Sequence, residues 1–84
     1  MRAMSGSGWR KLEQVVCRVE SQADERPIKF RWNNNWIKVD QVCSVWIERG
    51  PAEKDPAYRV FKVKSILGEH LLRVQLGGWI WEWR

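Results

Sequence analysis

The 84-residue chain has only two cysteines and one histidine, so it lacks the four such ligands that proteins use for a structural zinc site. Cys17 and Cys43 are far apart in the sequence and form no C-x-x-C pair. No apolar run approaches the about 20 residues of a membrane-spanning helix, and residues 1–9 lack the apolar core of a secretory signal. We therefore expect a cytoplasmic protein with two free, packed cysteines, no metal or other cofactor, and no membrane partner.

Catalytic side chains are equally scarce. The single histidine, His70, stands beside Glu69 at an expected turn with no nucleophile near it in the sequence, so we expect a surface residue. No Gly-rich phosphate loop occurs. The other carboxylates considered show no pairing that would suggest general acid–base work; they are Asp40, Glu48, Glu53 and Asp55. The sequence therefore predicts a protein that is not an enzyme.

Tryptophan, in contrast, is abundant, with seven residues in the chain. Trp79, Trp81 and Trp83 occupy alternate positions near its end, and a period of two is typical of a β-strand with one buried face. We expect a terminal strand, residues 79–83, whose tryptophans point into the core. A domain this small buries little surface otherwise, so large aromatic side chains must supply much of it. For Trp83, the alternative is an exposed ring that contacts a partner.

Alternating apolar and polar residues predict further strands over residues 13–21, 27–32, 36–49, 58–65 and 72–76. The alternation changes phase near Asp40-Gln41, which indicates a bulge or bend inside the long segment. Pro27 opens a strand, a position that tolerates proline. Residues 9–20 also fit a helical stripe, although their β-branched side chains favour a strand.

Turn-forming residues separate these strands. The expected turns and loops are residues 23–26, 33–35, 50–57, Gly68-Glu69 and Gly77-Gly78. The asparagines at 33–35 tolerate positive φ and predict a tight hairpin, and Gly77-Gly78 predicts a two-residue hairpin of the primed type. Residues 1–8 are interpreted as a disordered lead-in and residues 9–84 as a single domain. The prediction is an all-β fold, a small antiparallel meander of five or six strands that closes as a barrel or a rolled sheet.

A series of spaced aromatic and apolar residues runs through the last two thirds of the chain. It comprises Arg26-Pro27, Phe30-x-Trp32, Val39, Val42, Trp46, Tyr58-x-Val60, Leu72 and Trp79. This series resembles a small bacterial domain of unknown function that occurs alone and as the C-terminal appendage of ImuB-type proteins, which are relatives of the Y-family translesion polymerases. The chain departs from that family in having no aromatic residue in the 50–57 loop. The resemblance implies a β-rich fold and a link to DNA-damage proteins, and it brings no catalytic residues.

The charge pattern supports a hypothesis of nucleic-acid binding. The chain has a net charge of +5 and a sequence pI of about 9.7. Basic residues occur without acidic ones in two stretches, Arg26–Lys38 and Pro56–Gly68. Trp32 and Trp36 flank the asparagine turn of the first stretch, where a base could stack between phosphate-binding side chains. The candidate residues are Lys29, Arg31, Trp32, Trp36, Lys38, Arg59, Lys62 and Lys64.

Two alternatives stay open at this stage. Trp32 is in phase with Phe30 and Ile28, so it can equally belong to the core, and the two basic stretches can lie on one face or on opposite faces. The favoured function is a non-enzymatic module that binds single-stranded DNA or RNA. The alternative is a protein-interaction module, with a polymerase or DNA-repair partner or weak self-association through an exposed Trp83.

Overall fold

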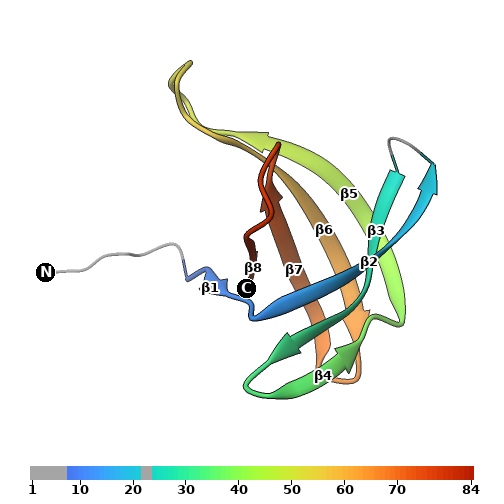
Figure 1. Cartoon of the computed structure of the whole chain (residues 1–84). Coiled ribbons are helices and arrows are strands. Elements are labelled where there is room, and N and C mark those ends of the chain that lie inside the picture. The colour runs from blue at the N-terminus through green and yellow to red at the C-terminus, as the bar shows by residue number, and fades with distance from the viewer. Residues whose placement is uncertain (1–7, 22–23) are drawn as a thin grey trace, which may run out of the picture.

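The computed structural model describes residues 8–21 and 24–84, and within them it contains β-strands and no helix (Figure 1). One sheet has five strands in the order β1-β8-β7-β6-β5, namely Arg10–Lys11, Trp81–Trp83, Gly68–Gln75, Ala57–Ser65 and Gln41–Arg49. The other has the order β2-β3-β4, namely Gln14–Ser21, Asp24–Trp32 and Asn35–Lys38. All pairings are antiparallel. The expected lead-in, residues 1–8, lies outside the described residues except for Gly8.

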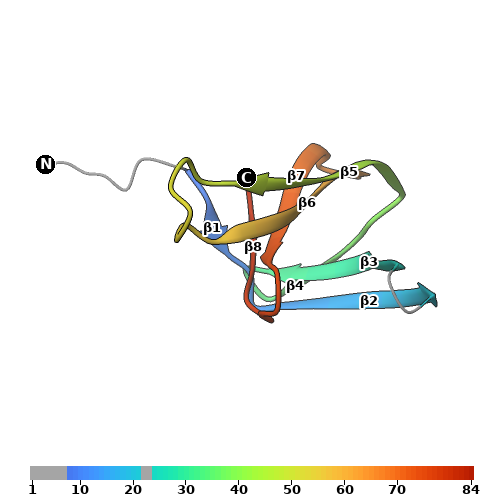
Figure 2. The ribbon, with the colours of Figure 1, turned by 90° about the horizontal axis from the view of Figure 1, so that it is seen from above.

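The two sheets form two layers whose inner faces meet (Figure 2). Both contribute to one buried apolar cluster, which consists of Leu12, Phe30, Ile37, Val39, Phe61, Val63 and Leu72. The all-β antiparallel prediction is confirmed, and so is the strand rather than the helix for the segment before residue 21. The sheets keep separate edges and do not close into a barrel.

The change of phase near Asp40 marks the point where the chain passes from one sheet to the other. β4 ends at Lys38 and β5 begins at Gln41. The Val39 amide still donates to the Ile28 carbonyl oxygen of the three-stranded sheet at 2.9 Å, whereas the Asp40 amide donates to the Lys64 carbonyl oxygen of the five-stranded sheet at 2.8 Å. The predicted bend is thus confirmed, and the expected long strand is two strands.

The asparagine turn also forms as predicted. Asn33 and Asn34 have φ values of 57° and 65°, as a type I′ hairpin requires at both central positions. The Asn35 side chain donates to the Asn33 carbonyl oxygen at 3.1 Å.

Three local predictions are wrong. Of the charged turn predicted at residues 23–26, Ala23 lies outside the described residues and Asp24 to Arg26 belong to β3. Pro27 lies inside that strand instead of opening it, at a register shift where its missing N–H breaks no regular ladder. The turn predicted at Gly68-Glu69 lies at 66–67, because Ser65 pairs directly with Gly68.

The Gly77-Gly78 segment makes a wider connection than the predicted two-residue hairpin. The Gly78 amide donates to the Gln75 carbonyl oxygen at 2.9 Å, and Gly77 has a φ of 81°, which a type II turn requires at its third residue. β8 therefore begins only at Trp81, which pairs with Val74. Residues 79 and 80 lie outside the ladder.

This register determines which of the terminal tryptophans pack into the core. Trp81 packs on Phe61 with ring centroids 5.6 Å apart, and Trp83 packs on Phe30 at 5.7 Å. Both confirm the expectation of a core role. Trp79 is 84% exposed, so the prediction that all three point into the core is wrong for this residue.

Candidate nucleic-acid interface

The outer face of the three-stranded sheet gathers several of the predicted site residues. In the β3–β4 ladder, Lys29 lies opposite Lys38 and Arg31 opposite Trp36. The residues between them, Phe30 and Ile37, are buried against the other sheet. Because side chains alternate along a strand, the four other residues point outward together. We call this group, Lys29, Arg31, Trp36 and Lys38, the basic face.

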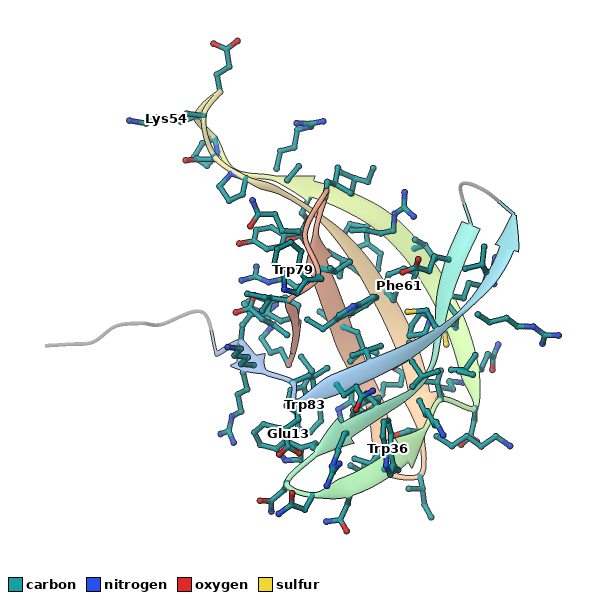
Figure 3. All side chains as sticks on the ribbon, in the orientation of Figure 1. Glu13, Trp36, Lys54, Phe61, Trp79 and Trp83 are labelled. Carbon is teal, nitrogen blue, oxygen red and sulfur yellow. The ribbon has the colours of Figure 1, made fainter. Side chains whose placement is uncertain are left out.

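Trp36 is the aromatic residue of the basic face (Figure 3). Its side chain is flanked by two cations, with the Lys29 Nζ 4.8 Å and the Arg31 Cζ 6.0 Å from the ring centroid. Both distances are within the range of cation–π contacts, so the two cations restrict the motion of the indole. Trp36 nevertheless remains 44% exposed, so part of its ring is open to a stacking ligand.

One carboxylate approaches the basic face from the side. Glu13 Oε1 lies 3.9 Å from Arg31 Nε and accepts a hydrogen bond from the Asn34 amide at 3.0 Å. The Arg31 Nη2 donates to Asn34 Oδ1 at 3.4 Å. The ion pair is half exposed on both sides and too long for a hydrogen bond, so it holds Arg31 loosely.

The face continues along β2 and β3 to two further arginines. Arg18 lies opposite Arg26, in the same alternation as Val16 opposite Lys29, and both arginines are exposed. Sequence reasoning placed Arg26 in a turn and did not select Arg18. Arg18 could have been found from its position two residues after Val16, because residues i and i+2 lie on the same face of a strand.

Trp32 does not join Trp36. It lies on the inner side of the same sheet, with its ring centroid 5.1 Å from that of Trp83 and partly buried against the core. Arg10 Cζ lies 5.9 Å from the centroid of its ring. Of the two tryptophans that flank the asparagine turn, only Trp36 is on the basic face.

The second basic stretch lies in the other sheet. Lys62 and Lys64 alternate with the buried Phe61 and Val63, so they point away from the core on the outer face of the five-stranded sheet. Lys62 Nζ also lies 3.6 Å from Glu69 Oε1. Because the two outer faces point in opposite directions (Figure 2), these lysines do not extend the basic face.

Arg59 is separated from both groups of basic residues. It shares the phase of Phe61, and so lies toward the inner side of β6, where it lines a pocket with Glu25 and Trp81. The basic residues that sequence reasoning selected therefore lie on three different surfaces.

The predictions for Trp83 and His70 also differ from what the structure shows. Trp83 packs against Phe30, Trp32 and His70 and is partly buried, so it is not the freely exposed ring that the docking alternative considered. His70 is a strand residue packed 4.9 Å from Trp83, and burial lowers the pKa of its imidazole. It is not the surface turn residue that was predicted.

The two cysteines are free, as expected, but only one is sheltered. Cys17 is half-buried; burial and the neighbouring carboxylate of Glu25 raise the pKa of its thiol to about 12. Cys43 is exposed because it is the extra residue at the register shift between Val42 and Ser44. The prediction that both are packed is wrong for Cys43.

Chemical groups for other functions are sparse in the described part of the chain. Residues 8–21 and 24–84 hold no cluster of three metal-ligating side chains. None of their elements is a helix long and apolar enough to cross a bilayer. Comparison with protein-family models, with curated proteins and with solved structures found no match. The relation to the ImuB-appended domain therefore stays a prediction.

Proposed function

We propose that this protein is a non-enzymatic module that binds single-stranded nucleic acid on the basic face. The observation that carries the proposal is the convergence of Lys29, Arg31 and Lys38 around the exposed ring of Trp36. No acidic residue occurs between Pro27 and Val39, so β4 and the part of β3 that builds the face contribute only positive charge, whereas Asp24 and Glu25 stand at the opposite end of β3.

Each part of the face has a role in this proposal. The ammonium groups of Lys29 and Lys38 and the guanidinium of Arg31 contact phosphates, and Trp36 stacks on one base. Stacking of this kind is worth about 1–3 kcal/mol per base and tolerates any sequence, because every base has a π-face. An unpaired strand is favoured because its bases are free to leave their neighbours and meet the indole.

The setting suggested by the sequence is compatible with this role. If the resemblance to the domain appended to ImuB-type proteins holds, the ligand would be the single strand exposed during DNA-damage tolerance. The proposal itself rests on the chemistry of the basic face and is independent of that relation.

A titration with a fluorescein-labelled oligothymidine tests the proposal. At low salt, anisotropy should rise and tryptophan fluorescence should be quenched as Trp36 stacks. In the Trp36→Phe variant, the anisotropy change should persist while the quenching falls strongly. The absence of binding at low salt would contradict the proposal, and so would binding that leaves the fluorescence of the wild-type protein unchanged.

A protein-interaction role is the second candidate, and a different surface favours it. Trp79 is 84% exposed and Ile80 53% exposed, and both line a hollow with Leu12 and Val15 between the sheets. Exposed tryptophan is typical of binding hot spots. In this alternative Trp79→Ala removes association with a protein partner and leaves oligonucleotide binding unchanged. Equal loss of partner binding in Trp36→Ala would argue against Trp79 as the contact.

A further inference from the structure

β5 is an open edge of the five-stranded sheet. It pairs with β6 along one side, and no other described strand pairs with its second side (Figure 1). Natural sheets usually protect such an edge with proline, with inward-pointing charges or with very short strands. β5 has nine residues, no proline and no lysine, and its bulge at Cys43 and its charge in the inward phase, Arg49, stand on either side of residues 44–48. Its edge is therefore available for pairing.

Two hydrogen bonds show which way the neighbouring strand directs its peptide groups. The Asp40 amide donates to the Lys64 carbonyl oxygen at 2.8 Å on the β5 side, and the Leu76 amide donates to the Ala57 carbonyl oxygen at 2.9 Å on the β7 side. In an antiparallel strand, the N–H and C=O of each residue point to one side, and the side alternates. Even-numbered residues of β6 therefore bond to β5.

The alternation determines which residues of β5 bond outward. Those opposite the even-numbered positions of β6, and so bonded to it, are Ser44, Trp46 and Glu48. The residues between them, Val45, Ile47 and Arg49, direct their N–H and C=O groups to the open edge. Val45 and Ile47 are also 45% and 52% exposed, although they lie on the inner side of the sheet, in line with the buried Phe61 row. Val45 and Ile47 thus combine unpaired backbone N–H and C=O groups with exposed aliphatic side chains.

We propose that the edge of β5 pairs antiparallel with β5 of a second copy of this chain, with Trp46 opposite Trp46. Around Trp46 the strand is self-complementary, as a two-fold interface requires. In this register Val45 of each copy lies opposite Ile47 of the other, and these are residues whose peptide groups point outward. A shift by two residues in either direction would place Ile47 opposite the irregular Cys43, or Val45 opposite Arg49.

The charges of the outer face are complementary in the same register. Ser44 of one copy lies opposite Glu48 of the second copy, and Ser44 has Lys62 as its neighbour within its own sheet. Glu48 of the second copy and Lys62 are then two strands apart, about 10 Å between backbones, with only a serine between them. Their long side chains can meet over it, and the two-fold axis creates this pair twice.

The dimer is expected to be weak. A single strand pairing buries much less than the about 800 Å² per partner of a standard stable interface. Association should therefore depend on concentration, with both forms populated between about 10 µM and about 1 mM protein. The basic face belongs to the other sheet, so this interface is independent of the proposed nucleic-acid site.

Sedimentation equilibrium over that concentration range tests the proposal. The wild-type protein should shift from monomer to dimer mass, and Ile47→Lys should remain monomeric at every concentration, because it places a charge on the edge. Ile66→Lys is the matched control, since Ile66 is 88% exposed in the β6–β7 turn. This variant should dimerise like the wild type. A monomer at all concentrations would overturn the proposal.

A cross-link tests the register. In a background with Cys17→Ala and Cys43→Ser, Trp46→Cys faces itself across the two-fold axis and should form a disulfide-linked dimer on mild oxidation. Ile47→Cys faces Val45 instead and should form at least tenfold less. Dimerisation that survives Ile47→Lys, or equal cross-linking by the two cysteine variants, would assign association to another surface and overturn the pairing.

Discussion

The double substitution Lys29→Glu with Arg31→Glu tests the proposed nucleic-acid site quantitatively. Binding to a single strand weakens with a log–log salt slope of about −0.7 per phosphate contact. Three contacts from Lys29, Arg31 and Lys38 predict a slope of about −2, and participation of Arg18 and Arg26 would steepen it to about −3.5. Between 50 and 200 mM salt, affinity should therefore fall by about 15-fold to about 100-fold.

The same arithmetic gives the effect of the double substitution. Each phosphate contact supplies about 0.9 decades of affinity at 50 mM salt relative to 1 M. Losing the two contacts made by Lys29 and Arg31 should weaken binding by about 50-fold to 100-fold and reduce the slope by about 1.4. The fold should be retained, because both side chains are on the solvent side of β3.

The control must separate a local site from overall charge. Lys54→Glu with Lys64→Glu changes the net charge by the same amount, but Lys54 lies in the 50–57 loop (Figure 3). Lys64 alternates with the buried Val63 and lies on the opposite outer face. Anisotropy titrations with one oligothymidine should show a change in affinity of less than about threefold and an unaltered slope, since separated surface charges are largely screened. Equal losses in the two double variants would refute the reasoning.

Three further predictions concern the ring, the core and a thiol. Trp36→Ala should weaken oligonucleotide binding by about 5-fold to 150-fold without altering the salt slope, because it removes stacking and no charge; a changed slope would contradict this. Leu72→Ala should lower the unfolding free energy by about 2–5 kcal/mol in urea denaturation, because Leu72 is fully buried in the shared core. A loss below about 1 kcal/mol would show that the surrounding side chains collapse into the cavity. The pKa of Cys17 is raised from 9.0 to about 12, so the folded state keeps a proton that the unfolded state has lost between these values, and stability should fall as pH rises through this range. Denaturation midpoints of the wild type and of Cys17→Ala, compared at about pH 8 and about pH 10.5, should show a smaller decrease in the variant, and parallel decreases would contradict the assignment.

Local features of the fold could be predicted because they depend on local physics. Asn33 and Asn34 form the turn since asparagine accepts positive φ, wherever the hairpin lies. The break at Asp40 was visible as a change in alternation, because a chain that crosses between two sheets must re-aim its side chains.

Features that depend on register could not be predicted. Alternation says which residues of one strand share a face, and it does not say which faces of distant strands coincide. Lys62 and Lys64 resemble Lys29 and Lys38 in sequence, and yet they lie on the opposite side of the molecule. Trp79 follows the same period as Trp81, but the wide turn before it delays the start of β8.

The most direct test of the nucleic-acid proposal is a map of the bound surface. Amide and indole NMR shifts of the labelled protein should be followed while a short oligothymidine is added at low salt. The account predicts the largest changes at Lys29, Arg31, Lys38 and the indole N–H of Trp36, with little change at Lys62. Shifts centred on the outer face of the five-stranded sheet, or no shifts at all, would contradict it.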